Sequence, residues 1–525
     1  MDTNLNMKFM HKLSIFKENI YKSKKYWIIY LALIIFASIS MLGIKNYQQP
    51  LIEIALIIIV ALLGIICISF YSNHNNNKQL YKFVFIVILT FGIVCSILSP
   101  ICCAPDEVEH FVRSEMTSRG EFFPNYENGS YLTIQSTIDL INDSAKIDSD
   151  TGYYSVNGEH SSILKTDSDT KPINTTLVKF PSAFAQNPFY GYLPQAIGMF
   201  IAKLFNLNCI WLLWLGRIFN TLLYASLVAI AVKKTPILKI PLFIISVIPL
   251  SIFQCASLSI DSMVNGLGIL TIAYFFYLYK SPDYSLNKKH IIIFCILSLL
   301  LGLCKITYFI FIFLILFVPK QKFEEKRMYY KSIIYIAIIG ILAILWIKFY
   351  VTPGTLNSFR GPHMELRNIN PTAQLSFILS HPRDFLISML EVPKLYFDTD
   401  LLFNSRIFGF NHFNSFYLMF LGTICLLYPK EEFDIKSRAG ALVISTLLYF
   451  GTYVNFLFSW TPVSNLEAIS GVQPRYFLPL FALFPFIFGI NNNTNNNTYE
   501  IDFYLITIAI TFLASMLLSL GIRIY

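Results

Sequence analysis

Charged residues are scarce in this chain: Asp, Glu, Lys and Arg together make up only 14% of its 525 residues. A soluble protein of this size divides into domains with charged surfaces, at roughly 25% charged residues. The deficit extends along the whole chain, and apolar runs of about 20 residues recur, which is the length that crosses a bilayer as a helix. The alternating strands of about 10 residues that a membrane β-barrel needs are missing. The sequence therefore predicts an all-α polytopic membrane protein.

Two further absences narrow the function. The nine cysteines include no CxxC pair, and the adjacent Cys102 and Cys103 have an apolar setting, so a site of paired zinc ligands is not expected. The net charge of +9 comes from lysines in short loops and not from a large basic patch, which argues against nucleic acid as a partner. Residues 1–26 are polar and basic, and no cleavable signal peptide is expected before the first apolar run.

Hydropathy places the first three spans near 27–44, 51–70 and 82–99. The lysines that precede the first span put the N-terminus in the cytoplasm, and three crossings then place residue 100 outside. Further spans are expected at 209–232, 237–255, 262–279, 331–350, 413–429, 438–459, 474–490 and 502–521. Together with the run 290–319, the count is about twelve or thirteen transmembrane helices.

Two apolar stretches are too irregular or too short to be ordinary spans. Residues 189–206 contain Pro194 and Lys203, and a full crossing there would place the basic end of the next span outside, so we expect an amphipathic helix in the outer interface. The run 290–319 has basic residues at both flanks but is too short for two full crossings. We therefore predict two short helices that meet near Gly302–Lys305.

This topology gathers four polar segments on the outer side, where they are expected to border one hollow: the loop 100–188, the tip at Asp261, the loop 351–411 and GVQPRY at 471–476. It also divides the chain into six parts. These are a cytoplasmic N-terminus (1–26), N-terminal spans (27–99), an outer loop with juxtamembrane helices and the candidate catalytic motif (100–208), further spans (209–350), a second outer loop (351–411) and C-terminal spans (412–525).

The polar run PDEVEHFVRSE at 105–115 follows closely on a predicted span. If 105–118 is helical, Asp106, His110 and Arg113 share one face at positions i, i+4 and i+7. That face could hold a general base, a metal ligand or proton shuttle, and an anion contact. The alternative, which the spacing alone favours, is that these charges form a solvated cap on a juxtamembrane helix, whose first turn attracts acidic residues.

Basic residues mark two other places. Arg475 in GVQPRY lies at the outer mouth of a predicted span, where it either snorkels to lipid headgroups or clamps a lipid-linked phosphate. Lys305 lies inside the apolar run LLLGLCKITYFIFIF, where a charge costs roughly 2.5–3.5 kcal/mol on insertion scales, so it is expected to face a cavity or a partner. Asp261 and Arg217 lie at span ends, where capping and snorkelling explain them.

Four stretches in a fixed order resemble the domain of unknown function 2142 family of predicted multi-span membrane proteins. They are PDEVEHFVRSEMTSRG, NPFYGYLPQAIG, GRIFNTLLYASLVAIAVKKTPILKIPLFIISVIPLSIFQCASLSIDS and GVQPRYFLPL. The resemblance extends over about residues 80–490, and the family is similar to glycosyltransferases of the GT-C superfamily. It implies a GT-C-like bundle of about 12–13 transmembrane helices, with a large first extracytoplasmic loop that contains juxtamembrane helices.

The resemblance also implies roles for particular residues, because GT-C enzymes carry a catalytic acidic residue at the start of that loop and use sugar donors on polyprenyl phosphate. The catalytic residues would be Asp106, as the base, with Glu107 and His110. The donor phosphate would be bound by Arg475, Lys305, Arg113, Gln473 and Tyr476. The lipid or acceptor groove would include Tyr190, Tyr192, Gln195 and Asp261. Some GT-C enzymes use a divalent cation, Mg²⁺ or Mn²⁺, for which Asp106, Glu107 and His110 could supply ligands.

Three functions are open at this point. The leading hypothesis is a membrane glycosyltransferase that moves a sugar from a polyprenyl-phosphate-linked donor to a cell-surface glycan, lipid or protein, on the outer face of the plasma membrane and among its lipids. A transporter or flippase for a lipid-linked saccharide would carry ionisable residues near the midplane and inverted repeats, and only Lys305 fits that expectation. The third is a non-catalytic scaffold of a polysaccharide assembly complex, with 100–188 as its docking surface.

Overall fold

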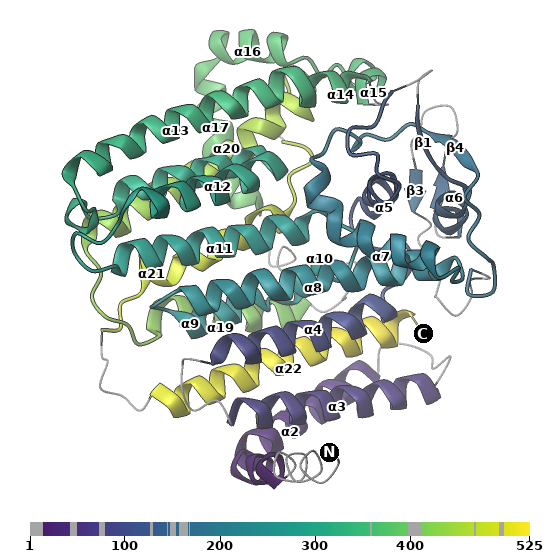
Figure 1. Ribbon diagram of the computed structural model, residues 1–525, viewed down its shortest axis with the longest axis vertical. Coiled ribbons are helices and arrows are strands. Elements are labelled where there is room, and N and C mark those ends of the chain that lie inside the picture. The colour runs from purple at the N-terminus through teal and green to yellow at the C-terminus, as the bar shows by residue number, and fades with distance from the viewer. Residues whose placement is uncertain are drawn as a thin grey trace, which may run out of the picture.

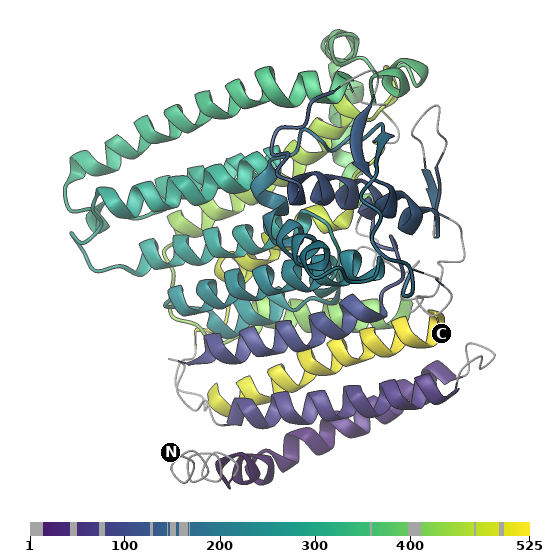
Figure 2. The ribbon, with the colours of Figure 1, turned by 45° about the vertical axis from the view of Figure 1, so that its right-hand side comes forward.

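The chain forms a helical bundle, with a smaller part that contains short strands at one end of it (Figure 1, Figure 2). Eight helices among the described residues are long and apolar enough to cross a membrane, which confirms the all-α polytopic prediction. The computed structural model describes residues 14–42, 50–72, 79–126, 130–143, 145–147, 154–156, 166, 168–357, 360–396, 411–466, 469–492 and 498–524.

The eight long helices are α2 (Lys24–Leu42), α3 (Pro50–Ser72), α4 (Leu80–Leu98), α8 (Ile210–Lys234), α11 (Asp261–Lys280), α13 (Lys326–Trp346), α20 (Ile435–Ser459) and α22 (Thr498–Ile524). The most central of them is α8, which packs against α4, α11 and the shorter α7. Nearly every residue of α11 is buried, whereas α2, α3 and α13 expose many apolar side chains. The outer helices therefore present the apolar surface that lipid tails require.

The last helix, α22, joins the two ends of the chain. It packs against α2, α3 and α4 and lies between α3 and α4 in the bundle (Figure 2). Lys25 Nζ and Glu500 Oε1 form an ion pair at 2.9 Å, and the rings of Tyr26 and Phe503 stack with centroids 3.9 Å apart. These contacts make α2, α3 and α22 one layer at the edge of the bundle.

Three predicted spans consist of shorter helices. The predicted span 237–255 consists of α9 (Lys239–Ser246) and α10 (Pro249–Cys255), and the span 413–429 is α19 (Asn411–Leu427). The span 474–490 consists of the 3-10 helix η7 (Pro474–Leu483) and α21 (Phe484–Phe488). Pro249 interrupts the helix in 237–255, because its ring nitrogen has no N–H to donate to the helical hydrogen bonds. Pro479 lies inside η7 and acts in the same way. The predicted count of about twelve or thirteen therefore includes pieces shorter than the eight long helices.

Residues 290–319 form the predicted helix pair, α12 (Lys288–Cys304) and the 3-10 helix η3 (Ile306–Phe317). The backbone is extended at Lys305, with φ −150° and ψ 109°, so this residue ends one helix and begins the next. A Cβ atom at Gly302 would lie 2.4 Å from the ring of Phe309, so a glycine lets the two helices fold against each other. The prediction of two short helices that meet near Gly302–Lys305 is confirmed.

The run 189–206 forms η2 (Phe189–Tyr192) and α7 (Leu193–Leu204). One face of α7 is buried and the other exposes Phe200 and Leu204, as expected of an amphipathic helix. A Cβ atom at Gly198 would lie 2.3 Å from the carbonyl oxygen of Leu215 in α8, so the close approach of these two backbones requires glycine. The helix that follows the first large polar segment is thereby anchored to the centre of the bundle.

The segment 100–188 covers one end of the bundle. Its helices and strands are α5 (Glu107–Ser118), β1 (Tyr131–Ile134), α6 (Gln135–Asn142), β2 (Ala145–Ile147), β3 (Tyr154–Val156) and β4 (Leu177–Phe180). Strands β1 and β4 pair antiparallel with Tyr131 opposite Phe180, and β2 pairs with β3. Almost every residue of α5 is buried, in a core shared with β1, α7 and α8. The interpretation of α5 as a solvated cap is therefore wrong.

The second polar segment, 351–411, is mostly helical in the part that the structure describes. Its helices are α14 (Thr352–Asn357), α15 (Arg360–Leu366), α16 (Pro371–Ser380) and α17 (Pro382–Tyr396). The π-helical turn η5 (Ile347–Val351) connects α13 to α14, and a short 3-10 turn, η4 (Lys320–Lys322), precedes α13. Single π turns within helices are often found at functional sites. Helices α14 and α15 lie at the same end of the bundle as α5 (Figure 1).

Candidate functional site

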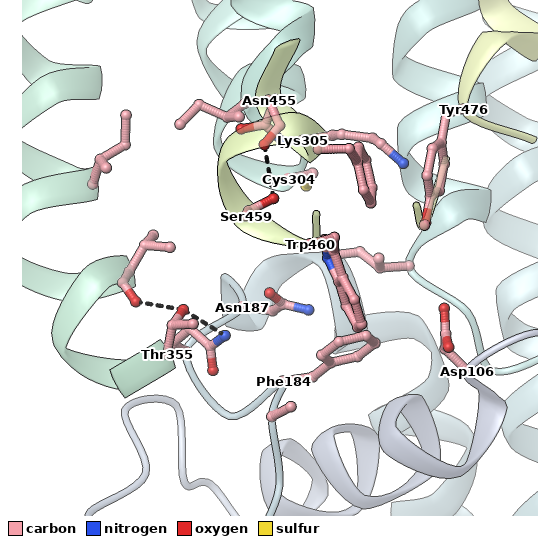
Figure 3. A pocket seen from close by; sticks show the side chains of 18 of the residues that line it. Asp106, Phe184, Asn187, Cys304, Lys305, Thr355, Asn455, Ser459, Trp460 and Tyr476 are labelled. Carbon is pink, nitrogen blue, oxygen red and sulfur yellow. Dashed lines mark hydrogen bonds between the residues drawn. The ribbon is translucent and has the colours of Figure 1, made fainter. Parts of the chain in front are cut away.

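A cavity of about 970 Å³ lies at this end of the bundle. It is bordered by α5, by the starts of α11 and η7, by α14, and by the turn between α12 and η3. Asp106, Asp261, His363 and Arg475 each line it from one of the four segments that were expected to border one hollow, and Lys305 joins them. Figure 3 shows Asp106 and Lys305 among the lining side chains. The structure thus brings these distant segments together around a single space.

Asp106 is one of two carboxylates of the acidic motif that line this cavity. It precedes α5 in the left-handed conformation, with φ 60° and ψ 15°, which is uncommon for a residue other than glycine and is often found where function requires it. Its side chain makes no capping bond to the helix. Instead, Oδ2 pairs with Arg475 Nη2, and 36% of the Asp106 side chain remains exposed. The strained turn therefore directs a carboxylate into the cavity and away from its own helix.

Arg475 connects two carboxylates to the backbone of the acidic motif. Its Nη1 donates to the carbonyl oxygen of Pro105 at 2.8 Å, and its Nε lies 3.2 Å from Asp261 Oδ2. Asp261 is the first residue of α11, where the helix dipole favours a negative charge. Only 4% of the Arg475 side chain is exposed. Asp261, predicted as a groove residue, therefore belongs to a charged cluster with Asp106 and Arg475.

Lys305 supplies the second cation of the cluster. Its Nζ lies 3.0 Å from the centroid of the Tyr476 ring, and the carboxylates of Asp261 and Asp106 act on it through their charge. The Tyr476 ring stacks on Phe456 with centroids 5.4 Å apart, and Tyr308 Oη donates to the Tyr476 carbonyl oxygen at 2.7 Å. An ammonium over an aromatic face keeps N–H donors available for an anion.

Glu107 points away from Asp106, into the bundle. Its carboxylate accepts hydrogen bonds from Nε and Nη2 of Arg217 at 2.8 Å each and from the backbone N–H of Leu258 at 3.0 Å. Arg217 also donates to the carbonyl oxygens of Ser99 and Pro100 at 2.7 Å each, and neither charged side chain is exposed. Two expectations are corrected: Arg217 does not snorkel, and Glu107 is not beside Asp106 in the cavity.

Arg113 also lies outside the cavity. Its buried guanidinium donates to the carbonyl oxygens of Asn187 at 3.0 and 3.2 Å, Phe122 at 2.9 Å and Glu121 at 3.3 Å, and to Thr117 Oγ1 at 2.8 Å. These bonds tie the chain after α5 to the chain before η2. The expectation that Arg113 binds the donor phosphate is corrected, because its donors are used within the fold.

His110 lines the cavity as a neutral side chain. Its Nδ1 lies 2.9 Å from Tyr192 Oη and its Nε2 lies 3.2 Å from Ser259 Oγ. Burial lowers the pKa of His110 to about 4, against a smaller opposing effect of the nearby Asp261. Tyr192, predicted as a groove residue, is fully buried behind His110. The structure therefore gives Tyr192 the task of orienting the imidazole.

Glu109 is a second carboxylate at the cavity that the sequence prediction did not include. Its Oε2 accepts hydrogen bonds from Ser182 Oγ at 2.8 Å and from the backbone N–H of Ala183 at 3.0 Å. Its Oε1 is buried with no partner among the described residues. Burial raises the pKa of Glu109 to about 7, with a smaller contribution from the charge of Asp106. This carboxyl group therefore changes its charge near neutral pH.

The remaining predicted residues divide between the cavity and the surrounding fold. Gln473, which precedes η7, lines the cavity. Tyr190 and Gln195 do not: Tyr190 Oη donates to the carbonyl oxygen of Leu300 at 2.6 Å, and Gln195 Nε2 donates to that of Leu258 at 3.3 Å. These two side chains hold the backbone of neighbouring segments in place, so they are not groove residues.

The three residues that were expected to hold a divalent metal do not converge on one point. Glu107 is bonded to Arg217, Asp106 is paired with Arg475, and both ring nitrogens of His110 have partners. Within the described ranges, no group of three or more His, Cys, Asp or Glu side chains is arranged to hold a metal ion. These residues therefore do not fit a Mg²⁺ or Mn²⁺ site.

Sequence reasoning missed the neutral side chains that complete the lining: Gln186, Asn187, Thr355, Asn455, Ser459 and Trp460. In Figure 3, Asn187 and Thr355 lie on the side of the cavity away from Asp106 and Tyr476, and the Trp460 indole projects into its middle. One sign was available, because Asn455 and Ser459 are polar residues at i and i+4 on the otherwise apolar end of α20. The others become visible only when the chain folds.

The opposite pKa shifts of Glu109 and His110 predict opposing pH effects on stability. The contribution of Glu109 to the free energy of unfolding is lost as the pH rises from 4.5, the ordinary pKa of Glu, to about 7. Over this range the unfolded chain has already released the proton, whereas the folded chain still holds it. The His110 contribution is lost as the pH falls from 6.5 to about 4. Each slope is at most about 1.4 kcal/mol per pH unit. The thermal midpoint of Glu109→Gln in detergent, measured relative to that of the wild type, should therefore fall as the pH falls from 6.5 to 4.5. If the difference between the two midpoints does not change with pH, the prediction is wrong.

The fold and the cavity define a class, a polytopic helical membrane protein with a charged site at one end of its bundle. The model of the family described as "Predicted membrane protein (DUF2142)" matches residues 89–484, and the chain belongs to this family. The matched range contains the residues that line the cavity and leaves out α2, α3 and α22. No curated protein and no solved structure matches the chain.

Proposed function

We propose that this protein is a membrane glycosyltransferase of the GT-C type. It moves a sugar from a polyprenyl-phosphate-linked donor to a cell-surface acceptor. The observation that carries the proposal is a partly exposed carboxylate, Asp106, beside two cations, Arg475 and Lys305, in a cavity with apolar walls. Transfer between a hydroxyl and a lipid-linked phosphate needs a proton acceptor, positive charge for the leaving phosphate and a surface for the lipid.

Asp106 is the group suited to accept the proton. Oδ2 is held by Arg475, whereas Oδ1 has no hydrogen-bond partner among the described residues. The hydroxyl oxygen of the acceptor forms a bond to the anomeric carbon, and its proton passes to Asp106 Oδ1. The bond from that carbon to the phosphate oxygen breaks, and the phosphate leaves with the electron pair. A positioned carboxylate of this kind contributes typically 10²–10⁴-fold to a rate.

Lys305 is the cation suited to bind the departing phosphate. All three guanidinium nitrogens of Arg475 already lie against Pro105, Asp106 or Asp261, so its main task is to hold the carboxylates and add positive charge. Lys305 keeps its ammonium group over Tyr476, where an incoming phosphate can reach it. Fixed positive charge at the point where negative charge develops lowers the barrier without reorganisation during the reaction.

The apolar wall of the cavity fits the lipid part of the donor. Five apolar side chains line the cavity here: Leu303, Ile306 and Phe309 around the α12–η3 turn, Trp346 at the end of α13, and Ile347 at the start of η5. This wall lies next to Lys305, so a polyprenyl chain along it would present its phosphate to the ammonium group. The lysine-rich N-terminus and short loops favour a cytoplasmic N-terminus, and three crossings by α2, α3 and α4 then put the cavity on the outer face.

The test separates transfer from transport and from scaffolding. Purified protein in proteoliposomes is incubated with a polyprenyl-phosphate donor whose sugar is radiolabelled and with an extract of cell-surface glycans. We expect label to leave the lipid carrier and to appear in acceptor material. Movement of intact labelled lipid between leaflets without cleavage would replace this proposal by a flippase, and neither cleavage nor movement would favour a scaffold.

A further inference from the structure

One side of the cavity carries only neutral polar groups and an indole. We name it the amide wall and define it by Gln186, Asn187, Thr355, Asn455, Ser459 and Trp460. These residues come from the segment before η2, from α14 and from the end of α20. The charged residues Asp106, Asp261, Arg475 and Lys305 line the same cavity, and Figure 3 shows Asp106 on the opposite side from Thr355. The cavity therefore offers neutral polar groups in addition to its charged ones.

Two buried acceptor atoms, one on this wall and one on a carboxyl group that adjoins it, lack a partner among the described residues. Gln186 is only 7% exposed; its Nε2 donates to Thr355 Oγ1 at 3.4 Å, while its Oε1 has no partner. Glu109 on α5 adjoins this wall, because its Oε2 accepts a hydrogen bond from the backbone N–H of Ala183 at 3.0 Å. It is 2% exposed, and its Oε1 also has no partner. A buried polar atom left unpaired costs about 1–3 kcal/mol, and such atoms in a cavity mark where a ligand donates hydrogen bonds.

Trp460 adds a flat apolar surface to these acceptors. It ends α20, and its ring projects into the cavity (Figure 3). An aromatic face next to amide and hydroxyl groups matches the two sides of a pyranose ring, which has an apolar C–H face and a rim of hydroxyl groups. None of the six side chains that define the amide wall carries a positive charge, so an acidic acceptor bound to this wall would find no cation on it.

We infer that the amide wall is the acceptor site and that it takes a neutral saccharide, stacked on Trp460 and hydrogen-bonded to Gln186 and Glu109. This inference rests on the proposed function, because it names the acceptor class for the same cavity. Of the three acceptor classes expected from the sequence (glycan, lipid or protein), the amide wall favours a glycan over a protein side chain, and it favours a neutral glycan over an acidic one. The acceptor hydroxyl reaches Asp106 from the amide wall while the donor phosphate is held at Lys305.

The test measures saccharide binding to the purified full-length chain in detergent by saturation-transfer-difference NMR and titration. The probes are neutral tetrasaccharides of glucose, galactose, mannose and N-acetylglucosamine, the anionic tetragalacturonate, and a peptide rich in Ser and Thr. We expect at least one neutral tetrasaccharide to bind. Trp460→Leu and Gln186→Leu should each weaken that binding by about tenfold or more, as loss of one such contact implies, while Trp460→Phe should keep most of it.

A second tryptophan serves as the matched control. Trp211 on α8 is partly exposed and does not line the cavity, so Trp211→Leu removes an indole without touching the amide wall and should leave saccharide binding unchanged. Equal weakening in Trp211→Leu and Trp460→Leu would overturn the inference. So would stronger binding of tetragalacturonate or of the peptide, or no binding of any neutral probe.

Photolabelling with a photoreactive polyprenyl monophosphate reports on the donor side separately. Wild type, Trp460→Leu and Gln186→Leu should all be labelled, because Lys305 keeps its contact with Tyr476 in each of them. Labelling also shows that the variants are folded. Labelling without saccharide binding would overturn the inference and leave the proposed donor intact. Saccharide binding without labelling would instead contradict the proposed polyprenyl-phosphate donor.

Discussion

Replacing Asp106 by Asn should lower the rate of sugar transfer by about 10²–10⁴-fold, the contribution expected of a general base. The substitution keeps the size of the side chain and removes only its charge and its capacity to take a proton. The backbone at this position has φ 60°, a conformation that Asn adopts more readily than most residues. We therefore expect the yield of folded protein and its thermal midpoint to remain close to those of the wild type, so that the loss falls on the chemistry.

The measurement is the release of labelled sugar from its lipid carrier in proteoliposomes, with Asp139→Asn as the control. Asp139 lies on α6, accepts a hydrogen bond from Gln135 and does not line the cavity, so its replacement should leave transfer unchanged. If Asp106→Asn transfers sugar at the wild-type rate, Asp106 is not the base. Glu109→Gln would then be the next variant to measure, because Glu109 is the other carboxyl group of the acidic motif that lines the cavity.

Replacing Arg217 by Met should destabilise the folded protein by about 3–5 kcal/mol, the cost of leaving a buried carboxylate without its partner. Arg217 lies in α8 and joins Glu107 to the carbonyl groups at the end of α4. Because neither charge is exposed, water cannot replace the lost contacts. We expect a thermal midpoint several degrees lower and less monodisperse protein after size-exclusion chromatography in detergent.

Two further variants show whether this loss comes from the unpaired charge. Glu107→Gln combined with Arg217→Met should recover part of the stability, because no buried carboxylate then remains unpaired. Lys203→Met removes one cation from Glu115, which keeps its ion pair with Arg119 at 2.9 Å, and should cost less than Arg217→Met. A double variant no more stable than Arg217→Met would show that the hydrogen bonds to carbonyl groups matter more than the ion pair.

The long apolar helices could be predicted from the sequence because a bilayer imposes a length and a composition on each of them. The turn at Lys305 could also be predicted, since basic flanks and a short run left little choice. The division of 237–255 into two helices was less accessible, although Pro249 marks the break. The helices of 351–411 were missed because polar composition was read as an open loop, whereas short helices packed on other segments need no long apolar run.

The candidate site was predictable to the extent that charge is rare in this chain. Asp106, Lys305 and Arg475 stood out because each lies next to or inside apolar sequence, and the structure brings all three to one cavity. The roles of neighbouring Asp106 and Glu107 could not be separated, because the left-handed turn that points them in opposite directions depends on tertiary contacts. The neutral residues of the amide wall carry no charge and therefore gave no comparable indication.

The layer formed by α2, α3 and α22 has a consequence for biosynthesis. All three helices lie outside the residues that the family model matches, yet they come from opposite ends of the chain and pack on one another. Because α2 and α3 precede α22 in the chain, a ribosome makes these two helices before the intervening bundle and before the partner on which they pack. Assembly of this edge therefore requires that the helices between them are synthesised first.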